Sequence, residues 1–292
     1  MVRQIYHKNT VSFSKQLQEK YSGIEVVGTI APNQPCRIES MTHGLFACFY
    51  CLLYGIYICE MEEVEPIAFL GENHLYFEKE NGSNVFEYYY KKKHKLTEKS
   101  IHELPIIIVS NPGKFLKWCR ISIFEKKMSN LIISKYFTLK NDIIKILSEF
   151  EKSNFAHSKI LGVHYRGTDK ITETPIAEFE EYERKIQVAL ESNLFNKIFF
   201  CSDEFKLRER VKKKFGDKII SYQNAADYGR NNKNRELGIH FTQSTPFLAG
   251  RDALIECYLL SRCNALLSSS RSSMSLFATF INPDLFHIVL EP

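Results

Sequence analysis

The chain lacks the residue spacings that hold a structural metal. Eight cysteines occur in 292 residues, but the pair Cys48-x-x-Cys51 has no second Cys or His pair at zinc-finger spacing. Internal repeats and low-complexity segments are absent as well, which excludes solenoids, collagen-like chains and disordered linkers as descriptions of the whole chain. The sequence therefore predicts a globular protein without a zinc site.

An export signal and a clear membrane span are also missing. The first residues, MVRQIYHKNT, are polar, unlike the apolar core of a signal peptide. The most apolar window, Leu45–Met61, contains Gly55 and a charged Glu60, and it is marginal in length for the roughly 20 residues that a span needs. We expect a buried helix there, with a membrane segment as the less favoured alternative. Most cysteines lie in apolar runs, where a reduced thiol behaves as a small hydrophobe, so we expect a cytoplasmic protein.

Strong charge of either sign is lacking too. The net charge is +5, with 44% hydrophobic and 25% charged residues, which is ordinary for a soluble globular protein. This mild, unclustered positive charge suits an anionic nucleotide ligand and gives no indication of nucleic acid binding. A chain of 292 residues buries a large core and favours two domains.

The most informative segment that is present is ILGVHYRGTDK, residues 160–170. Its apolar start predicts a buried strand, which ends in a turn around Gly167. Side chains alternate along a strand, so His164 and Arg166 lie on the same side and are able to touch one ligand. A forked guanidinium at a strand end of an open α/β sheet suits a phosphate. The alternative is a strand that runs into a solvated charged loop.

This segment resembles the first motif of the GDP-fucose-dependent fucosyltransferase superfamily, His-x-Arg-Arg/Gly-x-Asp at a strand end. The resemblance is nearest to the α-1,6-fucosyltransferase and Nod-factor fucosyltransferase group, in which His-x-Arg-Arg-Thr-Asp-Lys occurs; here Gly167 replaces the second Arg. Residues 197–204, KIFFCSDE, resemble the second motif, and residues 252–280 resemble the third. The three motifs follow in the expected order, over about residues 155–283.

Alternating strands and helices predict a doubly wound parallel sheet in the second half of the chain. The expected strands are 160–165, 197–201, 218–222, 264–268 and 286–290, and the expected helices are 176–192, 204–214, 248–261 and 272–280. The resemblance implies an α/β, GT-B-like fold in which two Rossmann-like domains face each other. We place the boundary after an amphipathic helix at 141–153. Residues 1–154 then form an N-terminal α/β domain on the acceptor side, and residues 155–292 form a Rossmann-like GDP-sugar-binding domain. In the N-terminal part we expect a strand at 23–30, followed by a loop over 31–40.

The resemblance also implies roles for individual residues. Arg166 matches an Arg that binds the β-phosphate, Glu256 matches an acid that accepts hydrogen bonds from guanine, and His164 matches a His that contacts the nucleoside. The other implied donor-site residues are Asp203, Glu204, Ser270, Ser272 and Ser273. The alternatives stay open: a buried structural His, a serine N-cap, and acids that serve a helix N-cap and first turn.

Two residues are candidates for catalysis. Arg166 would stabilise the charge that grows on the leaving diphosphate. Glu173 lies one residue earlier than a Glu in some α-1,6 relatives and is the candidate base, with a surface loop Glu as the alternative. The chain has no Asp-x-Asp flanked by apolar residues, and Arg166 is able to neutralise the diphosphate. We therefore expect no metal and no cofactor.

Together these features predict an inverting, metal-independent fucosyltransferase of glycan biosynthesis that uses GDP-fucose as donor. The expected acceptor is a glycan, a glycolipid or a lipid-linked oligosaccharide, and peripheral membrane association remains open. One alternative is transfer of another GDP-linked sugar. The other is a non-catalytic nucleotide- or glycan-binding module on the same fold.

Overall fold

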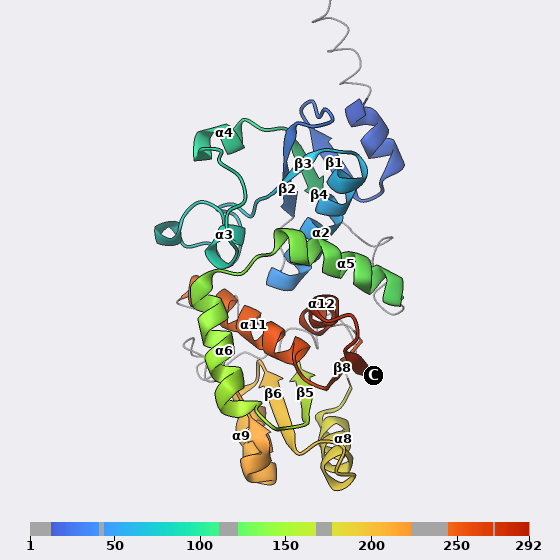
Figure 1. Ribbon diagram of the computed structural model, residues 1–292, viewed down its shortest axis with the longest axis vertical. Coiled ribbons are helices and arrows are strands. Elements are labelled where there is room, and N and C mark those ends of the chain that lie inside the picture. The colour runs from blue at the N-terminus through green and yellow to red at the C-terminus, as the bar shows by residue number, and fades with distance from the viewer. Residues whose placement is uncertain are drawn as a thin grey trace, which may run out of the picture. The chain divides into compact units, whose positions relative to one another are not determined.

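The computed structural model describes residues 13–40, 44–110, 122–167, 177–222, 245–270 and 272–291. The chain divides into two compact units (Figure 1). The first contains Met1–Ile121 and Leu131–Thr138, and the second contains Ser122–Asn130 and Leu139–Pro292. Helix α6 (Asn141–Asn154), which the sequence predicts, is grouped with the second unit, whereas the sequence-based boundary lies behind it.

The first unit contains a mixed four-stranded sheet. Its strands are β1 (Ile24–Val27), β2 (Pro35–Ser40), β3 (Glu65–Ala68) and β4 (Ile106–Val109), in the order β1-β4-β2-β3. Strand β2 runs parallel to both of its neighbours, and the edge strand β1 runs antiparallel to β4. The sheet is therefore not fully parallel. Many α/β folds carry such an antiparallel edge strand on an otherwise parallel sheet. Strand β1 ends before the predicted residue 30 because Gly28 turns the chain with a φ of +87°.

Strand β2 corrects a prediction, because residues 31–40 were expected to form a loop. Two prolines favoured that interpretation, but Pro35 is the first residue of the strand, where the missing N–H breaks no ladder bond. Cys36 and Ile38 are fully buried. The strand therefore lies in the core of the first unit and brings Arg37 and Glu39 with it.

Helix α2 (Leu45–Met61) packs against this sheet, and most of its 17 residues are buried. It approaches β2 so closely that a Cβ at Gly55 would collide with the side chain of Ile38. The expectation of a buried helix in the most apolar window is thereby confirmed. None of the described helices is both long and apolar enough to cross a membrane.

The remaining described helices of the first unit are short. They are a helix at 13–20, the 3₁₀ turn Lys79–Asn81, α3 (Phe86–Tyr89) and α4 (Glu98–His102), while α5 (Ile123–Tyr136) contributes residues to both units. An aromatic cluster joins α2 to α3 and to the end of α5. Phe49 packs edge-to-face against Phe86, Tyr90 and Phe137.

The second unit contains a wholly parallel five-stranded sheet, as predicted. Its strands are β5 (Ile160–Tyr165), β6 (Lys197–Ser202), β7 (Ile219–Ile220), β8 (Ala265–Ser269) and β9 (Phe286–Leu290), in the order β7-β6-β5-β8-β9. Its helices are α8 (Phe179–Glu191), α9 (Phe205–Phe215), α11 (Pro246–Ser261) and α12 (Ser273–Ile281). This strand order defines a doubly wound Rossmann-like sheet.

The two faces of this sheet are covered by different helices (Figure 1). Leu161 and Val163 of β5 pack in one core cluster with residues of α8 and α9. The intervening Gly162 lies against the end of α11, and His164 contacts α12. The period-two alternation of β5 therefore directs His164 to the α11/α12 face.

Candidate functional site

The candidate site lies where the strand order of the second sheet reverses. The chain adds β6 and then β7 on one side of β5, and β8 and β9 on the other. In open α/β sheets, ligands bind at such a switch point, outside the carboxyl ends of the strands. The carboxyl ends of β5 and β8 carry His164, Arg166 and the serines that lead into α12.

His164 is buried against the start of α12, with 6% of its surface exposed. Its Nδ1 lies 2.7 Å from Ser275 Oγ and 2.9 Å from Ser272 Oγ. Ser272 is the N-cap of α12 and accepts a hydrogen bond from the Ser275 backbone N–H. Burial lowers the pKa of His164 to about 3, helped by the positive charges of Arg166 and Arg208. The imidazole is therefore neutral at physiological pH.

Two guanidinium groups, those of Arg166 and Arg208, act on this imidazole. Arg166 follows β5 directly and is half-buried. Arg208 extends from α9, where its Nε donates to the Ser202 carbonyl at 2.5 Å. The charges of Arg166 and Arg208 both reach this neutral histidine, although Arg208 is itself paired with Glu256. Guanidinium donors at a strand end suit a diphosphate.

Glu256 is buried on α11, with 4% of its surface exposed, and Arg208 Nη2 donates to its Oε1 at 2.9 Å. The pair joins α9 to α11 behind the carboxyl end of β6. Carboxylates are rarely buried this completely without a cation. Arg208 thus fixes the position of the carboxylate that Glu256 would offer to a ligand.

A second acid on α11, Asp252, lies one turn before Glu256 and is completely buried. Arg251 donates to its Oδ1 from Nη2 at 3.0 Å and from Nε at 3.2 Å. Burial raises the pKa of Tyr222 to about 12, and the charges of Asp252 and Glu256 contribute to the rise. Helix α11 therefore carries two buried acids, Asp252 and Glu256, whose charges reach Tyr222 just beyond β7.

Asp203 and Glu204, which follow β6, pack against the turn after β5. The Gly167 N–H donates to Asp203 Oδ1 at 3.2 Å. A Cβ at Gly167 would collide with the Glu204 carboxylate and the ring of Tyr165. A larger residue at this position would therefore have to displace the Glu204 side chain and the Tyr165 ring. Glu204 is the N-cap residue of α9, but its side chain makes no capping hydrogen bond, so the alternative N-cap role receives no support.

The predicted serines separate into two groups. Ser272 joins His164, as described above, whereas Ser270 Oγ donates to Glu291 Oε2 at 2.9 Å, just beyond β9. Ser273 is the half-buried first residue of α12. The N-terminus of α12 thus presents Ser272 and Ser273, while Ser270 stabilises the neighbouring chain end.

Sequence reasoning missed two residues of this site. Ser275 follows the N-cap Ser272 by three residues, so helical spacing alone places both hydroxyls on one side. Arg208 belongs to a strongly basic helix, and nothing in its spacing distinguishes it from the arginine two residues later; only the packing of α9 against β6 and α11 selects it. The candidate base Glu173 and the polar residues Thr168, Asp169 and Lys170 lie outside the described residues.

No protein-family model matches the chain, and no curated protein is significantly similar to it in sequence. Solved structures are similar in fold. The fucosyltransferase NodZ from Bradyrhizobium is 16% identical and superposes with a TM-score of 0.54, covering 85% of this chain and 92% of that chain. A FUT1 mutant from Arabidopsis thaliana in complex with GDP is 12% identical, with a TM-score of 0.51, covering 96% and 75%. Apo POFUT1 is 10% identical, with a TM-score of 0.53, covering 91% and 100%.

These similarities establish the fold. The chain has an α/β fold with parallel strands, similar to the GT-B structures of GDP-fucose fucosyltransferases. The predicted α/β, GT-B-like fold and the Rossmann-like sheet after residue 155 are confirmed.

Proposed function

We propose that the protein is a fucosyltransferase that transfers fucose from GDP-fucose to a hydroxyl group of a glycan, with inversion and without a metal ion. The observation that carries the proposal is the geometry at the switch point of the sheet, where β5 ends in Arg166 and where His164 contacts Ser272 and Ser275 at the start of α12. The similar fold of NodZ supports the proposal, since one of its structures shows this α-1,6-fucosyltransferase soaked with GDP-fucose.

In this reaction an acceptor oxygen attacks the anomeric carbon of fucose from the face opposite GDP. The bond from that carbon to the β-phosphate oxygen breaks, and GDP leaves with the electron pair. Arg166 donates to the β-phosphate, where negative charge develops, so its contribution grows toward the transition state. Ser272 and Ser273, at the free N–H groups that begin α12, add donors for the same anion.

Glu256 recognises guanine, whose adjacent ring and amino N–H groups match the two oxygens of a carboxylate. Arg208 orients this carboxylate through its 2.9 Å bond to Oε1. His164, fixed by Ser272 and Ser275, contacts the nucleoside without adding a charge. Asp203 and Glu204 shape the turn at Gly167 and complete the donor site from β6.

Glu173 is the base of this proposal and takes the proton of the acceptor hydroxyl. Residues 155–292 bind the donor, and residues 1–154 bind the acceptor, which is a glycan, a glycolipid or a lipid-linked oligosaccharide in the cytoplasm. Arg166 does the work that a divalent cation does in other nucleotide-sugar enzymes. We expect turnover to survive EDTA; if chelation abolished it and manganese restored it, the metal-independent site would be wrong.

Calorimetry with GDP and UDP tests the donor site. Uracil lacks the adjacent pair of donors that Glu256 accepts, so GDP should bind more tightly by about 2–4 kcal/mol. Glu256→Gln should reduce this preference, while Glu209→Gln, on an exposed face of α9, is the matched control. Equal affinities for GDP and UDP would contradict the assignment. Release of GDP from GDP-fucose, but not from other GDP-linked sugars, then identifies the transferred sugar.

A further inference from the structure

The first unit contains a cavity of about 700 Å³ that the donor site does not use. It is lined by the end of β2, by the chain that follows β3 and by α4, and we call it the β2–α4 pocket. Its size falls within the range of small-ligand sites. It lies at the carboxyl ends of two parallel strands, where α/β sheets bind ligands.

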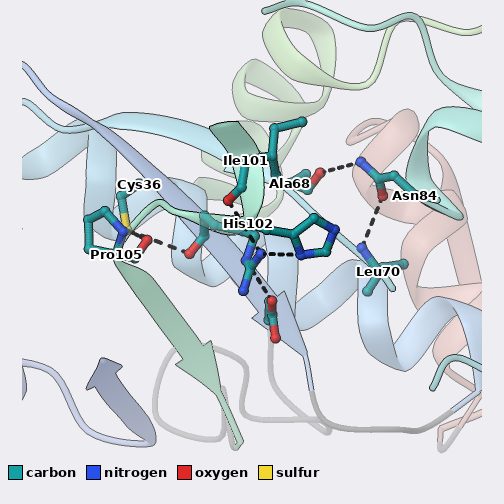
Figure 2. Close-up of polar contacts among 9 residues, drawn as sticks. Cys36, Ala68, Leu70, Asn84, Ile101, His102 and Pro105 are labelled. Carbon is teal, nitrogen blue, oxygen red and sulfur yellow. Dashed lines mark hydrogen bonds and ion pairs between the residues drawn. The ribbon is translucent and has the colours of Figure 1, made fainter. Parts of the chain in front are cut away.

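Arg37 forms the floor of this pocket and is rigidly held. Only 7% of its surface is exposed, and its guanidinium lies 5.0 Å from the centre of the Phe69 ring. Its Nη1 donates to the Ile101 carbonyl at 3.3 Å and to His102 Nδ1 at 3.2 Å, as the contacts around Ile101 and His102 in Figure 2 show. Its Nε pairs with Glu39 Oε1 at 2.7 Å. Arg37 thus connects β2 to α4, two of the segments that line the pocket.

The wall formed by the segment after β3 is held by the buried Asn84 (Figure 2). Its Oδ1 accepts from the Leu70 N–H at 3.0 Å, and its Nδ2 donates to the Ala68 carbonyl at 3.0 Å. These bonds replace the ladder that ends with β3 and hold the following residues in place. Glu72 and Asn73 belong to this wall, line the pocket and are exposed. The pocket is therefore preformed and offers polar groups at its mouth.

The charges of the lining favour a neutral ligand over an acidic one. Three carboxylates, Glu39, Glu72 and Glu98, line the pocket with two cations, Arg37 and Lys79. Arg37 is already neutralised by Glu39, which leaves two exposed acids facing one exposed lysine. Burial lowers the pKa of His74 to about 4, so this lining residue adds no charge. His102 accepts a bond from Arg37 at Nδ1, which requires that nitrogen to be unprotonated.

Carboxylate and amide oxygens beside aromatic rings match a neutral sugar. Each hydroxyl of a sugar donates one hydrogen bond, and a carboxylate accepts from two of them. The rings of Phe69 and Phe77 supply the apolar part of the lining. A phosphate or a sugar acid would instead meet the carboxylates of Glu72 and Glu98, which repel it.

We propose that the β2–α4 pocket binds the acceptor, and that the acceptor offers it a neutral oligosaccharide. The role of the bound glycan as an acceptor rests on the proposed fucosyl transfer. The preference for a neutral glycan rests on the pocket alone. Glu72, Asn73 and Glu98 are specificity-determining residues that hold sugar hydroxyls.

Binding of defined glycans to the full-length chain tests the proposal. The probes are lactose, maltotriose and N,N′-diacetylchitobiose, with 3′-sialyllactose as the acidic counterpart, followed by saturation-transfer NMR and titration. We expect at least one neutral probe to bind and the acidic probe to bind at least tenfold more weakly. Glu72→Ala combined with Glu98→Ala should weaken the neutral probe about tenfold or more, because charge-assisted hydrogen bonds are lost.

Glu103→Ala is the matched control, since Glu103 is an exposed acid at the end of α4 that does not line the pocket. It should leave binding within twofold, and circular dichroism should show that all variants are folded. The proposal is overturned if no neutral probe binds, if 3′-sialyllactose binds equally well, or if the double variant binds like the wild type. GDP affinity, measured on the same proteins, separates the two proposals: failure of GDP binding would end the fucosyl-transfer proposal and leave the glycan result standing.

Discussion

Both units place an arginine–glutamate pair near strand ends, but they build it differently. In the second unit, Arg208 and Glu256 are 48 positions apart and join α9 to α11. In the first, Arg37 and Glu39 are neighbours on one face of β2 and border an open cavity. The buried Arg208–Glu256 pair suits a rigid site for a ligand of fixed shape. Exposed groups lie beside the Arg37–Glu39 pair, and substitutions of these groups should not unfold the unit.

This difference fits the two substrates of the proposed fucosyl transfer. A nucleotide diphosphate has one shape and a fixed charge, so a rigid site of buried pairs recognises it well. Acceptors differ between related enzymes. Substitutions of the exposed acids that line a preformed pocket would change which acceptor it binds. The following predictions test whether the units differ in this way.

The largest effect is expected at the buried pair of the second unit. Glu256→Ala removes the carboxylate partner of the mostly buried Arg208 guanidinium, so the free energy of unfolding should fall by about 3–5 kcal/mol. Glu39→Ala should have a smaller effect, about 1–2 kcal/mol, because Arg37 keeps its bonds to Ile101 and His102. Urea unfolding measures both, and equal losses would remove the contrast between the pairs.

Arg166→Lys should lower kcat by ~10²-fold or more, about 3 kcal/mol. Lysine keeps the charge but loses the planar fork that, in the proposed reaction, stabilises the leaving β-phosphate. Arg166→Ala should be slower still. The Glu72→Ala variant of the first unit should instead raise KM for the acceptor and leave kcat nearly unchanged. Normal turnover in a folded Arg166→Ala variant would refute the phosphate role.

Asn84→Ala should destabilise the first unit without affecting the donor site. The buried N–H groups of Leu70 and Phe86 lose the oxygen that accepts from both, which should lower the free energy of unfolding by roughly 2–3 kcal/mol. Asn264 offers a comparison in the second unit, where its side chain accepts from the Ile160 N–H. Titration with GDP should give the wild-type affinity for Asn84→Ala; a tenfold loss would show that the units are not independent in this respect.

Stability should fall in mild acid, chiefly through the second unit. Burial lowers the pKa of His164 to about 3 and of His287 to about 4, whereas His74, at about 4, is the one such histidine among the described residues of the first unit. The unfolded chain takes up these protons below about pH 6.5, but the folded chain does not, so the free energy of unfolding falls as the pH falls. His164 alone should account for about 2 kcal/mol between pH 6.5 and pH 5. Urea unfolding of His164→Gln should show a shallower pH dependence; an unchanged slope would contradict the buried, neutral state of His164.

Periodicity predicted most of the second unit. The apolar run at 160–163 and the alternation that follows it predicted β5, and the same face of the strand carries His164 and Arg166 because strand geometry is local. The helical period at 141–153 predicted α6. In the first unit, β2 escaped prediction because its prolines and charged residues resemble a loop, and its strand partners lie far away in the sequence.

The sequence by itself determined the parallel order of strands and helices after residue 160, the buried nature of α2, and the presence of His164, Arg166 and Glu256 in motif order. These features follow from side-chain periodicity and local turns. The tertiary structure alone decided that Arg208 pairs with Glu256, that Ser275 joins His164, and that three separate segments line the β2–α4 pocket. Such contacts depend on how helices pack across a sheet, and packing brings together residues whose separation in the sequence carries no signal.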